Sequence, residues 1–185
     1  MSSISLYLII MVLSYLLGSI PSAYLLGRIY GIDMRQAGSG NIGTMNTRAT
    51  LGWKPAVLVL VLDLAKGMLA VYMASIAGAN LMLAGSMAVL GHIYPLWLNF
   101  RGGKGLATGA GALIAGACPL SVVVFLLFTL ISYPLLKQIN LSSILSTIAT
   151  VIASIILYGC DAFLILLGLI IIFKHLSVLK PDLPK

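Results

Sequence analysis

Long apolar segments separated by short polar breaks constrain the fold of this chain more than any other feature. They lie at roughly residues 4–27, 55–77, 80–98, 105–117, 119–136, 142–158 and 161–174. A helix needs about 20 apolar residues to cross the ~30 Å hydrocarbon core of a bilayer, and fewer where protein shelters it. The composition agrees, since 61% of the residues are hydrophobic and 8% are charged, against about 25% charged in soluble domains. These values exclude a water-soluble globule and indicate an all-α, polytopic membrane protein with a single domain over residues 1–185.

The basic residues indicate how many spans there are and which way they run. Ten of the eleven Lys and Arg residues fall at alternate junctions if the chain crosses the membrane seven times. These are Arg28, Arg35, Arg48, Lys54, Arg101, Lys104, Lys137, Lys174, Lys180 and Lys185. By the positive-inside rule, these junctions are cytoplasmic. Merging 105–136 into one kinked helix would move Lys137 outside, so we expect seven transmembrane helices, an external N-terminus and a cytoplasmic C-terminus.

The net charge and the cysteines exclude several classes of function. A formal charge of +7 favours anionic partners such as lipid headgroups or phosphorylated substrates. Nucleic acid is not an expected partner, because the bases are scattered between apolar runs. Cys118 and Cys160 are too few and too far apart for a metal site, and we interpret them as small apolar residues, with a disulfide as the alternative. The N-terminal apolar run lacks the features of a removable signal peptide and is expected to stay as the first span.

A glycine-rich segment within the long polar stretch 28–54 has the composition of a phosphate-binding loop. It reads GSGNIGTMNTR over residues 38–48. Glycines let the backbone approach an anion closely and present successive N–H groups to it. Ser, Asn and Thr add short donors, and Arg48 adds a planar guanidinium that suits phosphate. The alternative is a turn that only reverses the chain, because Gly, Asn and Ser also favour turns.

A second glycine-rich turn, RGGKG over residues 101–105, leads directly into an apolar segment. The free N–H groups and the dipole of a helix N-terminus favour anions, and Arg101 and Lys104 strengthen this preference. The turn is not a Walker A loop, since Leu98 and Gly105 stand where that pattern requires Gly and Ser or Thr. The alternative is a basic loop that only sets topology, which leaves three glycines around one lysine unexplained.

Asp63 and Lys66 are charged residues inside the second apolar segment, about 14–18 Å beyond Lys54 along a helix. Each charge costs about 2.5–3.5 kcal/mol near the centre of a membrane helix. Their i, i+3 spacing places both on one helix face, where they can neutralise each other inside a bundle. We therefore expect a structural pair near the site, with a direct catalytic role for either residue as the alternative.

Two later segments carry polar groups at the expected cytoplasmic ends of spans. Ser142 and Ser143 start the sixth span, and Lys174 and His175 end the seventh. A serine at the start of a helix can simply cap it, and a single histidine at an interface is more often structural. The residues alone therefore assign these groups no chemical role.

Taken together, the motifs resemble those of the bacterial acyl-phosphate-dependent glycerol-3-phosphate acyltransferase family, PlsY. The matching motifs are LGSIP (17–21), GSGNIG (38–43), Asn46, Arg48, LG (51–52), DLAKG (63–67), GHIYP (91–95) and GGKG (102–105). The match is dense over residues 14–110 and weaker afterwards, where SSI (142–144) and His175 remain. The resemblance implies a seven-helix enzyme of the bacterial cytoplasmic (inner) membrane whose cytoplasmic loops bind both substrates.

The resemblance also implies a reaction. A fatty acyl group passes from acyl phosphate to the 1-hydroxyl of glycerol 3-phosphate, giving lysophosphatidic acid and phosphate. Because acyl phosphate is a mixed anhydride with a good leaving group, no covalent enzyme nucleophile, metal or other cofactor is required. The site must position two phosphate groups, compensate their charge and give the acyl chain an apolar slot. The expected partners are acyl phosphate, glycerol 3-phosphate and membrane lipid.

The roles of individual residues follow from the resemblance, position by position. The expected catalytic residues are Ser39, Arg48, Lys104 and His175. The expected substrate-binding residues are Gly40, Asn41, Gly43, Asn46, Gly102, Gly103, Gly105 and Ser142. No dedicated protein base is expected, because a substrate phosphate oxygen can accept the hydroxyl proton, and His175 is the competing candidate.

Two departures from the family pattern bear on the acceptor. Where the family usually reads GATN, this chain has GTMN over residues 43–46. Where the family has Asn three places after its C-terminal histidine, this chain has Val178, and Ser177 is the candidate substitute. A different acceptor alcohol, or a weakened paralogue, is therefore the alternative to the glycerol 3-phosphate reaction.

Other classes of membrane protein fit the sequence less well. Acyltransferases that use His and Asp five residues apart are excluded, because Trp97 and Lys180 follow the two histidines at that distance. A CDP-alcohol phosphotransferase needs clustered aspartates for divalent metal, and the four aspartates here are scattered. An anion or phosphate-ester transporter is the non-enzymatic alternative, but it needs sites near the midplane and an inverted repeat.

Overall fold

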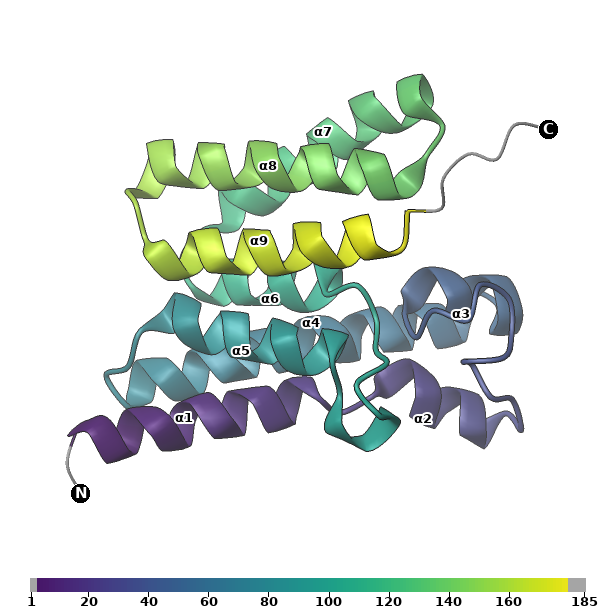
Figure 1. Ribbon diagram of the computed structural model, residues 1–185, viewed down its shortest axis with the longest axis horizontal. Coiled ribbons are helices and arrows are strands. Elements are labelled where there is room, and N and C mark those ends of the chain that lie inside the picture. Colours follow the sequence, from purple (N-terminus) through teal and green to yellow (C-terminus); the bar gives the residue numbers. More distant parts are fainter. Residues whose placement is uncertain (1–2, 180–185) are drawn as a thin grey trace.

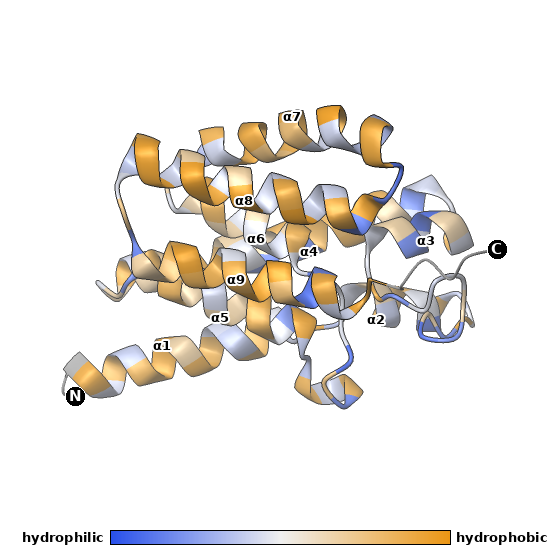
Figure 2. Cartoon of the chain, turned by 45° about the horizontal axis from the view of Figure 1, so that its top comes forward, coloured by the Kyte–Doolittle hydropathy of each residue, from blue (hydrophilic) through white to orange (hydrophobic). Residues whose placement is uncertain are grey.

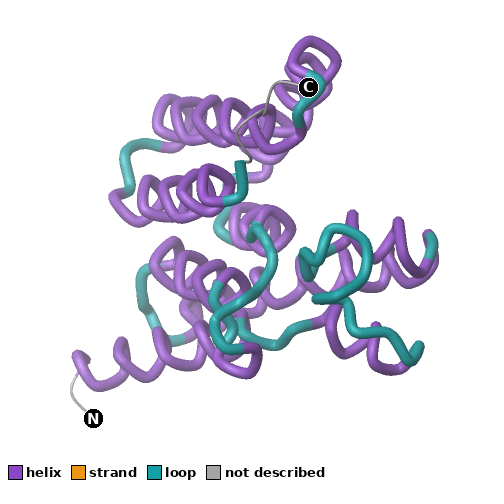
Figure 3. The backbone as a smooth tube through the Cα atoms, turned by 45° about the vertical axis from the view of Figure 1, so that its right-hand side comes forward, coloured by secondary structure: helices purple, strands orange, loops and turns teal. Residues whose placement is uncertain are grey.

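The computed structural model describes residues 3–179, and these form helices and no strand (Figures 1 and 3). The helices are α1 (Ser3–Gly18), α2 (Ser22–Ile29), α3 (Thr44–Leu51), α4 (Trp53–Ile76), α5 (Leu81–Ile93), the 3-10 helix η1 (Leu96–Leu98), α6 (Leu106–Ala115), α7 (Pro119–Leu136), α8 (Ile139–Tyr158) and α9 (Ala162–Ser177). The expected all-helical fold is confirmed.

The long helices run lengthwise through one bundle, so their connections gather at its two ends (Figure 1). One end carries the beginning of α1 and the turns at 77–80, 116–118 and 159–161. The other end, called the loop end below, carries α2, α3, the segment 99–105 and the close of α9. All the segments that the sequence singled out for phosphate chemistry therefore lie at one end of the bundle.

The long helices also have the length and polarity of membrane spans. Five helical segments are long and apolar enough to cross a bilayer: Ile4–Ile29, Trp53–Ile76, Leu81–Leu98, Pro119–Leu136 and Ile139–Tyr158. The remaining two, α6 and α9, are apolar but shorter. Apolar residues cover the helices along the bundle, while hydrophilic residues concentrate in loops and near the loop end (Figure 2). The chain is therefore a multi-pass membrane protein, and its number of crossings depends on whether α6 and α9 also cross.

The first apolar segment, expected as one span, is divided into α1 and α2 by a break at residues 19–21. Pro21 has no N–H, so the helical hydrogen-bond ladder cannot continue through it. The predicted first span is present as the candidate span Ile4–Ile29, with this break inside it. At the break, the carbonyl of Ile20 accepts a hydrogen bond from Nζ of Lys66 at 3.0 Å.

Glycines let α4 and α6 approach very closely. A Cβ atom added at Gly67 would overlap the carbonyl oxygen of Thr108, and one added at Gly111 would overlap that of Leu64. Small residues at such crossings are typical of membrane bundles, where close packing replaces the hydrophobic effect between helices. This contact fixes the start of α6, and with it the loop that carries Lys104, against the side of α4.

The polar stretch between α2 and α4 contains a helix that the sequence did not predict. Residues 44–51 form α3, and Oγ1 of Thr47 donates to the carbonyl of Gly43 at 3.1 Å in its first turn. The segment was missed because it lacks an apolar stripe and its stability comes from packing against α4.

The two cysteines are not joined. Cys118 is buried at the start of α7 and Cys160 is exposed in the turn before α9, and both are free thiols. The alternative of a disulfide is therefore wrong, and Cys118 packs as a small apolar residue in a core cluster with Met82 and Leu164.

Candidate active site

The side chain of Asn46 organises the first glycine-rich loop. Asn46 lies in the first turn of α3 and is 4% exposed. Its Nδ2 donates to the carbonyls of Met34 (3.3 Å) and Ala37 (3.0 Å), while its Oδ1 accepts the backbone N–H of Ser39 at 2.9 Å. Because both Nδ2 protons are used inside the protein, this carboxamide shapes the loop from beneath.

The outer edge of this loop is formed by Ser39, Gly40 and Asn41. Ser39 is exposed, and its Oγ accepts a long hydrogen bond of 3.4 Å from the N–H of Asn41. Gly40 has a φ of 72°, a left-handed conformation that glycine adopts without steric cost. Gly43 follows in extended conformation and is the N-cap of α3. The loop thus presents a hydroxyl, an amide and a helix N-terminus at the loop end of the molecule.

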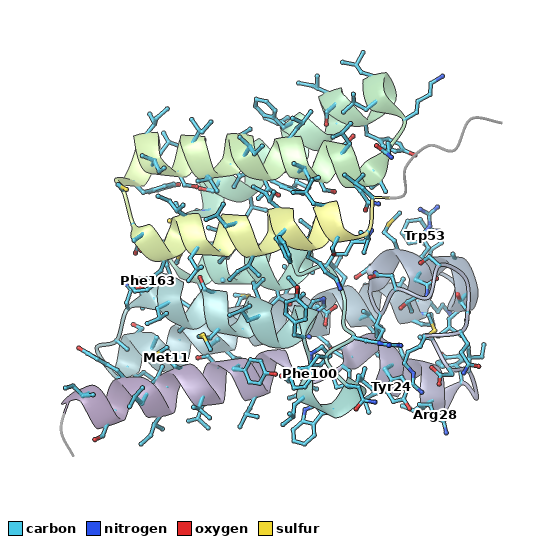
Figure 4. All side chains as sticks on the ribbon, viewed as in Figure 1. Met11, Tyr24, Arg28, Trp53, Phe100 and Phe163 are labelled. Carbon is cyan, nitrogen blue, oxygen red and sulfur yellow. The ribbon has the colours of Figure 1, made fainter. Side chains whose placement is uncertain are left out.

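Arg48 lies apart from these donors, on the exposed side of α3. Its guanidinium carbon is 4.0 Å from the ring centroid of Trp53, a cation–π contact. Trp53 lies at the loop end, as do Tyr24 and Arg28 (Figure 4). Arg48 is therefore a surface cation beside an aromatic residue of the kind enriched at membrane interfaces.

The second glycine-rich loop is held against the end of α5 by its own backbone. The N–H groups of Gly102 and Gly103 donate to the carbonyls of Ile93 (2.9 Å) and His92 (3.1 Å). These two N–H groups are thus engaged within the protein and hold the loop in place. A Cβ added at Gly103 would lie 2.8 Å from the carbonyl oxygen of Ile42, so the two glycine-rich loops meet at this glycine.

Lys104 extends from this loop toward the start of α8. Its Nζ donates to Oδ1 of Asn140 at 2.5 Å, and the side chain is half-buried. Burial lowers the pKa of the Lys104 ammonium below its usual value, and the nearby positive charge of Lys174 lowers it further. Gly105, with a φ of 85°, then caps α6. Lys104 and Asn140 lie 36 positions apart in the sequence, so only the folded chain shows their contact.

Ser142 and His175 are buried near the same end of the bundle, each bonded to its own helix. Oγ of Ser142 donates to the carbonyl of Gln138 at 3.1 Å, and Nδ1 of His175 lies 2.9 Å from the carbonyl oxygen of Ile171. Since α8 begins at Ile139, Ser142 lies inside the helix, and the alternative that it caps the helix is wrong. In the described residues, neither side chain hydrogen-bonds to Lys104.

The C-terminal departure from the family pattern lies at the end of α9. Val178 is the C-cap residue of the helix and is 37% exposed. Oγ of Ser177 donates to the carbonyl of Lys174 at 2.8 Å, so this hydroxyl is bonded to its own helix. The role of Ser177 as a substitute for the missing amide stays a prediction.

The charged pair in α4 lines a small cavity together with residues of both glycine-rich loops. Nζ of Lys66 is 3.0 Å from Oδ1 of Asp63, and both side chains are buried. Nδ1 of His92 lies 3.8 Å from the same carboxylate oxygen. The i, i+3 spacing predicted the pair. It did not predict that His92, which comes from another helix, approaches Asp63. Among the described residues, no group of three or more His, Cys, Asp or Glu side chains is arranged to hold a metal ion.

Comparison with known proteins identifies the family. The sequence profile of glycerol-3-phosphate acyltransferases matches residues 8–181. This chain belongs to the glycerol-3-phosphate acyltransferase family. It is 42% identical over 176 residues to a Bacillus cereus glycerol-3-phosphate acyltransferase 2, covering 90% of this chain and 86% of the relative. A Wolbachia pipientis glycerol-3-phosphate acyltransferase is also 42% identical, over 173 residues and 90% of each chain.

Solved structures of glycerol-3-phosphate acyltransferases share the same fold. The crystal structure of PlsY, an integral membrane glycerol 3-phosphate acyltransferase, in its glycerol 3-phosphate form is 32% identical with a TM-score of 0.82. Its lysophosphatidic acid form is 31% identical with a TM-score of 0.81. Each comparison covers 92% of this chain and 88% of the other. The resemblance that the motifs indicated is therefore confirmed at the level of family and fold.

Proposed function

We propose that this protein transfers a fatty acyl group from acyl phosphate to the 1-hydroxyl of glycerol 3-phosphate, releasing lysophosphatidic acid and phosphate. One observation carries the proposal: the two glycine-rich loops meet at Ile42 and Gly103, and Lys104 beside them stands two residues before an apolar groove. Two phosphate groups and an acyl chain are the ligands that such a combination of polar loops and apolar groove suits.

The apolar groove lies between α6, α7, α8 and α9 and provides the acyl slot. Its lining is Leu106, Gly109, Ala110, Leu113, Val122, Phe125, Thr147, Thr150, Val151, Ser154, Leu164, Leu167, Gly168 and Ile171. The hydroxyl groups of Thr147, Thr150 and Ser154 donate to carbonyls of their own helix, so they leave the groove without unpaired donors. The groove starts beside the loop that holds Lys104 and continues toward the opposite end of the bundle.

The chemistry requires little from the protein beyond position and charge. The 1-oxygen of glycerol 3-phosphate attacks the acyl carbonyl, a new ester bond forms, and the bond from the acyl carbon to the phosphate oxygen breaks. Lys104 and Arg48 compensate negative charge, while Ser39, Asn41 and the backbone of the loops donate hydrogen bonds. Ser142 contacts the polar headgroup of a substrate, and Asn46 shapes the first glycine-rich loop.

The hydroxyl proton passes to a phosphate oxygen of a substrate in this proposal. The carbonyl of Ile171 can only accept, so Nδ1 of His175 carries the proton of the neutral ring and Nε2 is the basic atom. His175 is 1% exposed, which places that atom away from water. We expect His175→Gln to keep the shape of the plot of kcat against pH. Loss of one limb of that plot would make the histidine the proton acceptor.

The proposed location is the bacterial cytoplasmic membrane, crossed seven times if α6 and α9 are counted with the five long spans. In this arrangement the loop end faces the cytoplasm, because it carries most of the basic residues. Glycerol 3-phosphate then reaches the site from water, and the acyl chain enters the groove from the lipid.

The test uses the purified protein in lipid with palmitoyl phosphate and glycerol 3-phosphate, and measures phosphate and lysophosphatidic acid together. We expect one of each per turnover, and a fall of about a hundredfold or more in Lys104→Ala, since a preorganised charge at a reacting group is worth that much. Arg28→Ala, which removes an exposed cation at the same end, is the matched control and should keep most of the activity.

Four results would contradict the proposal. Equal rates for Lys104→Ala and the wild-type protein would remove Lys104 from catalysis. Turnover with an acyl thioester but none with palmitoyl phosphate would assign another donor. Uptake of glycerol 3-phosphate into vesicles without any ester formed would favour the transporter, and turnover only with a different alcohol would favour a variant acceptor.

A further inference from the structure

We propose that Asp63, Lys66 and His92 form a buried positioning cluster that fixes the two glycine-rich loops relative to each other. By holding the loops together, the cluster favours attack on the acyl carbonyl by the acceptor hydroxyl over attack by water. This inference rests on the proposed acyl-phosphate reaction, and its test separates the two.

The cluster is buried and internally paired. Asp63, Lys66 and His92 are 2%, 4% and 8% exposed, and the carboxylate oxygen of Asp63 faces both Nζ of Lys66 (3.0 Å) and Nδ1 of His92 (3.8 Å). Charges within membrane helices are expensive and are retained mainly where they serve a function. Lys66 and Asp63 are paired within α4, and the approach of His92 to Asp63 brings α5 against this pair.

On one side, the cluster holds the break between α1 and α2. Nζ of Lys66 donates to the carbonyl of Ile20 at 3.0 Å. A small cavity extends from this contact, and its lining includes Ser19, Ile42 and Gly103 together with the three cluster residues. The cavity therefore touches the helix break and both glycine-rich loops.

On the other side, the cluster holds the second loop. The carbonyl of His92 accepts the N–H of Gly103, and the imidazole lies so close to Gly103 that an added Cβ would overlap its Nε2. The same Cβ would lie 2.8 Å from the carbonyl oxygen of Ile42, in the first loop. Gly103 is thus enclosed between the ring of His92 and the first loop, and Asp63 lies 3.8 Å from that ring on its other nitrogen.

The consequence concerns the competition between two nucleophiles. Attack by glycerol 3-phosphate breaks the acyl–phosphate bond and forms an ester, whereas attack by water breaks the same bond and gives a free fatty acid and phosphate. A displacement of about 1 Å can slow an oriented reaction about a hundredfold. Displaced loops would therefore slow transfer to the alcohol more than attack by water, because water needs no bound headgroup to position it.

The experiment measures phosphate, lysophosphatidic acid and free fatty acid in the same reaction, with the enzyme-free hydrolysis subtracted. We compare the wild-type protein with His92→Ala and with the double variant Asp63→Asn/Lys66→Met, which removes both charges so that neither is left unpaired. Ser86→Ala is the matched control, because Ser86 is also buried in α5 but bonds to Met82 and Phe163, away from the loops.

We expect about one phosphate per lysophosphatidic acid in the wild-type protein and the control, and about two or more in both cluster variants, since misplacement on this scale favours water. We also expect kcat for ester formation to fall about tenfold or more, with KM for glycerol 3-phosphate changed less than about twofold. Partial unfolding lowers the yield of every product together, so it leaves this ratio unchanged.

The inference is overturned if both cluster variants keep the wild-type ratio, or if Ser86→Ala raises it equally. The proposed function fails differently, because the wild-type protein would then form no lysophosphatidic acid from palmitoyl phosphate. The two failures are thus seen in different samples.

Discussion

Lys104 has an environment unlike that of the exposed cations around it. It is half-buried, it bonds to Asn140, and burial together with Lys174 lowers its pKa. The sequence predicted Lys104 as a phosphate-binding cation from the glycines that flank it. It did not predict the contact with Asn140 or the position of His92 over Gly103, because both depend on which helices pack together and not on local spacing.

The lowered pKa of Lys104 predicts a pH dependence. An anion binds the charged ammonium, so kcat/KM falls as the pH rises through the lowered pKa, at a lower pH than for an ordinary lysine. Arginine stays charged throughout this range, and Lys104→Arg should therefore move the alkaline limb of kcat/KM upward by about one pH unit or more. The maximal rate should fall, because a guanidinium does not replace an ammonium in geometry. In the control variant Arg28→Lys, the alkaline limb should stay where it is in the wild-type protein. If the limb also stays there in Lys104→Arg, the titrating group is not Lys104.

The individual helices were largely predictable from apolar runs, and the exceptions have local causes. The break after α1 depends on one proline within an otherwise apolar stretch, and α3 has no apolar stripe to reveal it. Helix α8 begins at Ile139, three residues before the predicted start. The apolar pattern missed its first turn because that turn includes the polar residue Asn140. The apolar groove between α6, α7, α8 and α9 was expected only as a slot in the bundle, since its walls come from four separate segments.

The groove predicts a specific effect of neighbouring residues on α7. Val122 lines the groove, near the end far from Lys104, whereas Val123 is 49% exposed on the outer face of the helix. Val122→Trp should fill the far end and lower the rate with palmitoyl phosphate about tenfold relative to octanoyl phosphate, because shape changes in apolar pockets discriminate on this scale. Val123→Trp should leave this ratio unchanged. Equal ratios in the two variants would place the acyl chain elsewhere.

At the scale of the whole molecule, the two glycine-rich loops lie at one end of the bundle, and the turn between α8 and α9, which carries the exposed Cys160, lies at the other (Figure 1). The charge distribution predicted that these loops share one side of the membrane. The sequence could not settle the count of crossings, because α6 and α9 are shorter than the other spans.

Labelling from the two sides of the membrane tests the proposed topology. In a Cys118→Ala background, Cys160 should react with an impermeant maleimide applied to intact cells. Met45, which is 65% exposed in α3, offers the opposite probe. Met45→Cys in a background without the native cysteines should react only after permeabilisation. Reaction of both positions from one side would refute the seven-span arrangement.

The break at Pro21 reaches further than the path of the first helix. An uninterrupted helix would use the carbonyl of Ile20 for its own ladder, whereas the interrupted one offers that oxygen to Lys66. Pro21 therefore leaves a backbone carbonyl that solvates the ammonium of Lys66 in α4, in a layer where water is scarce. Replacing that proline would therefore disturb a charge 45 positions further along the chain.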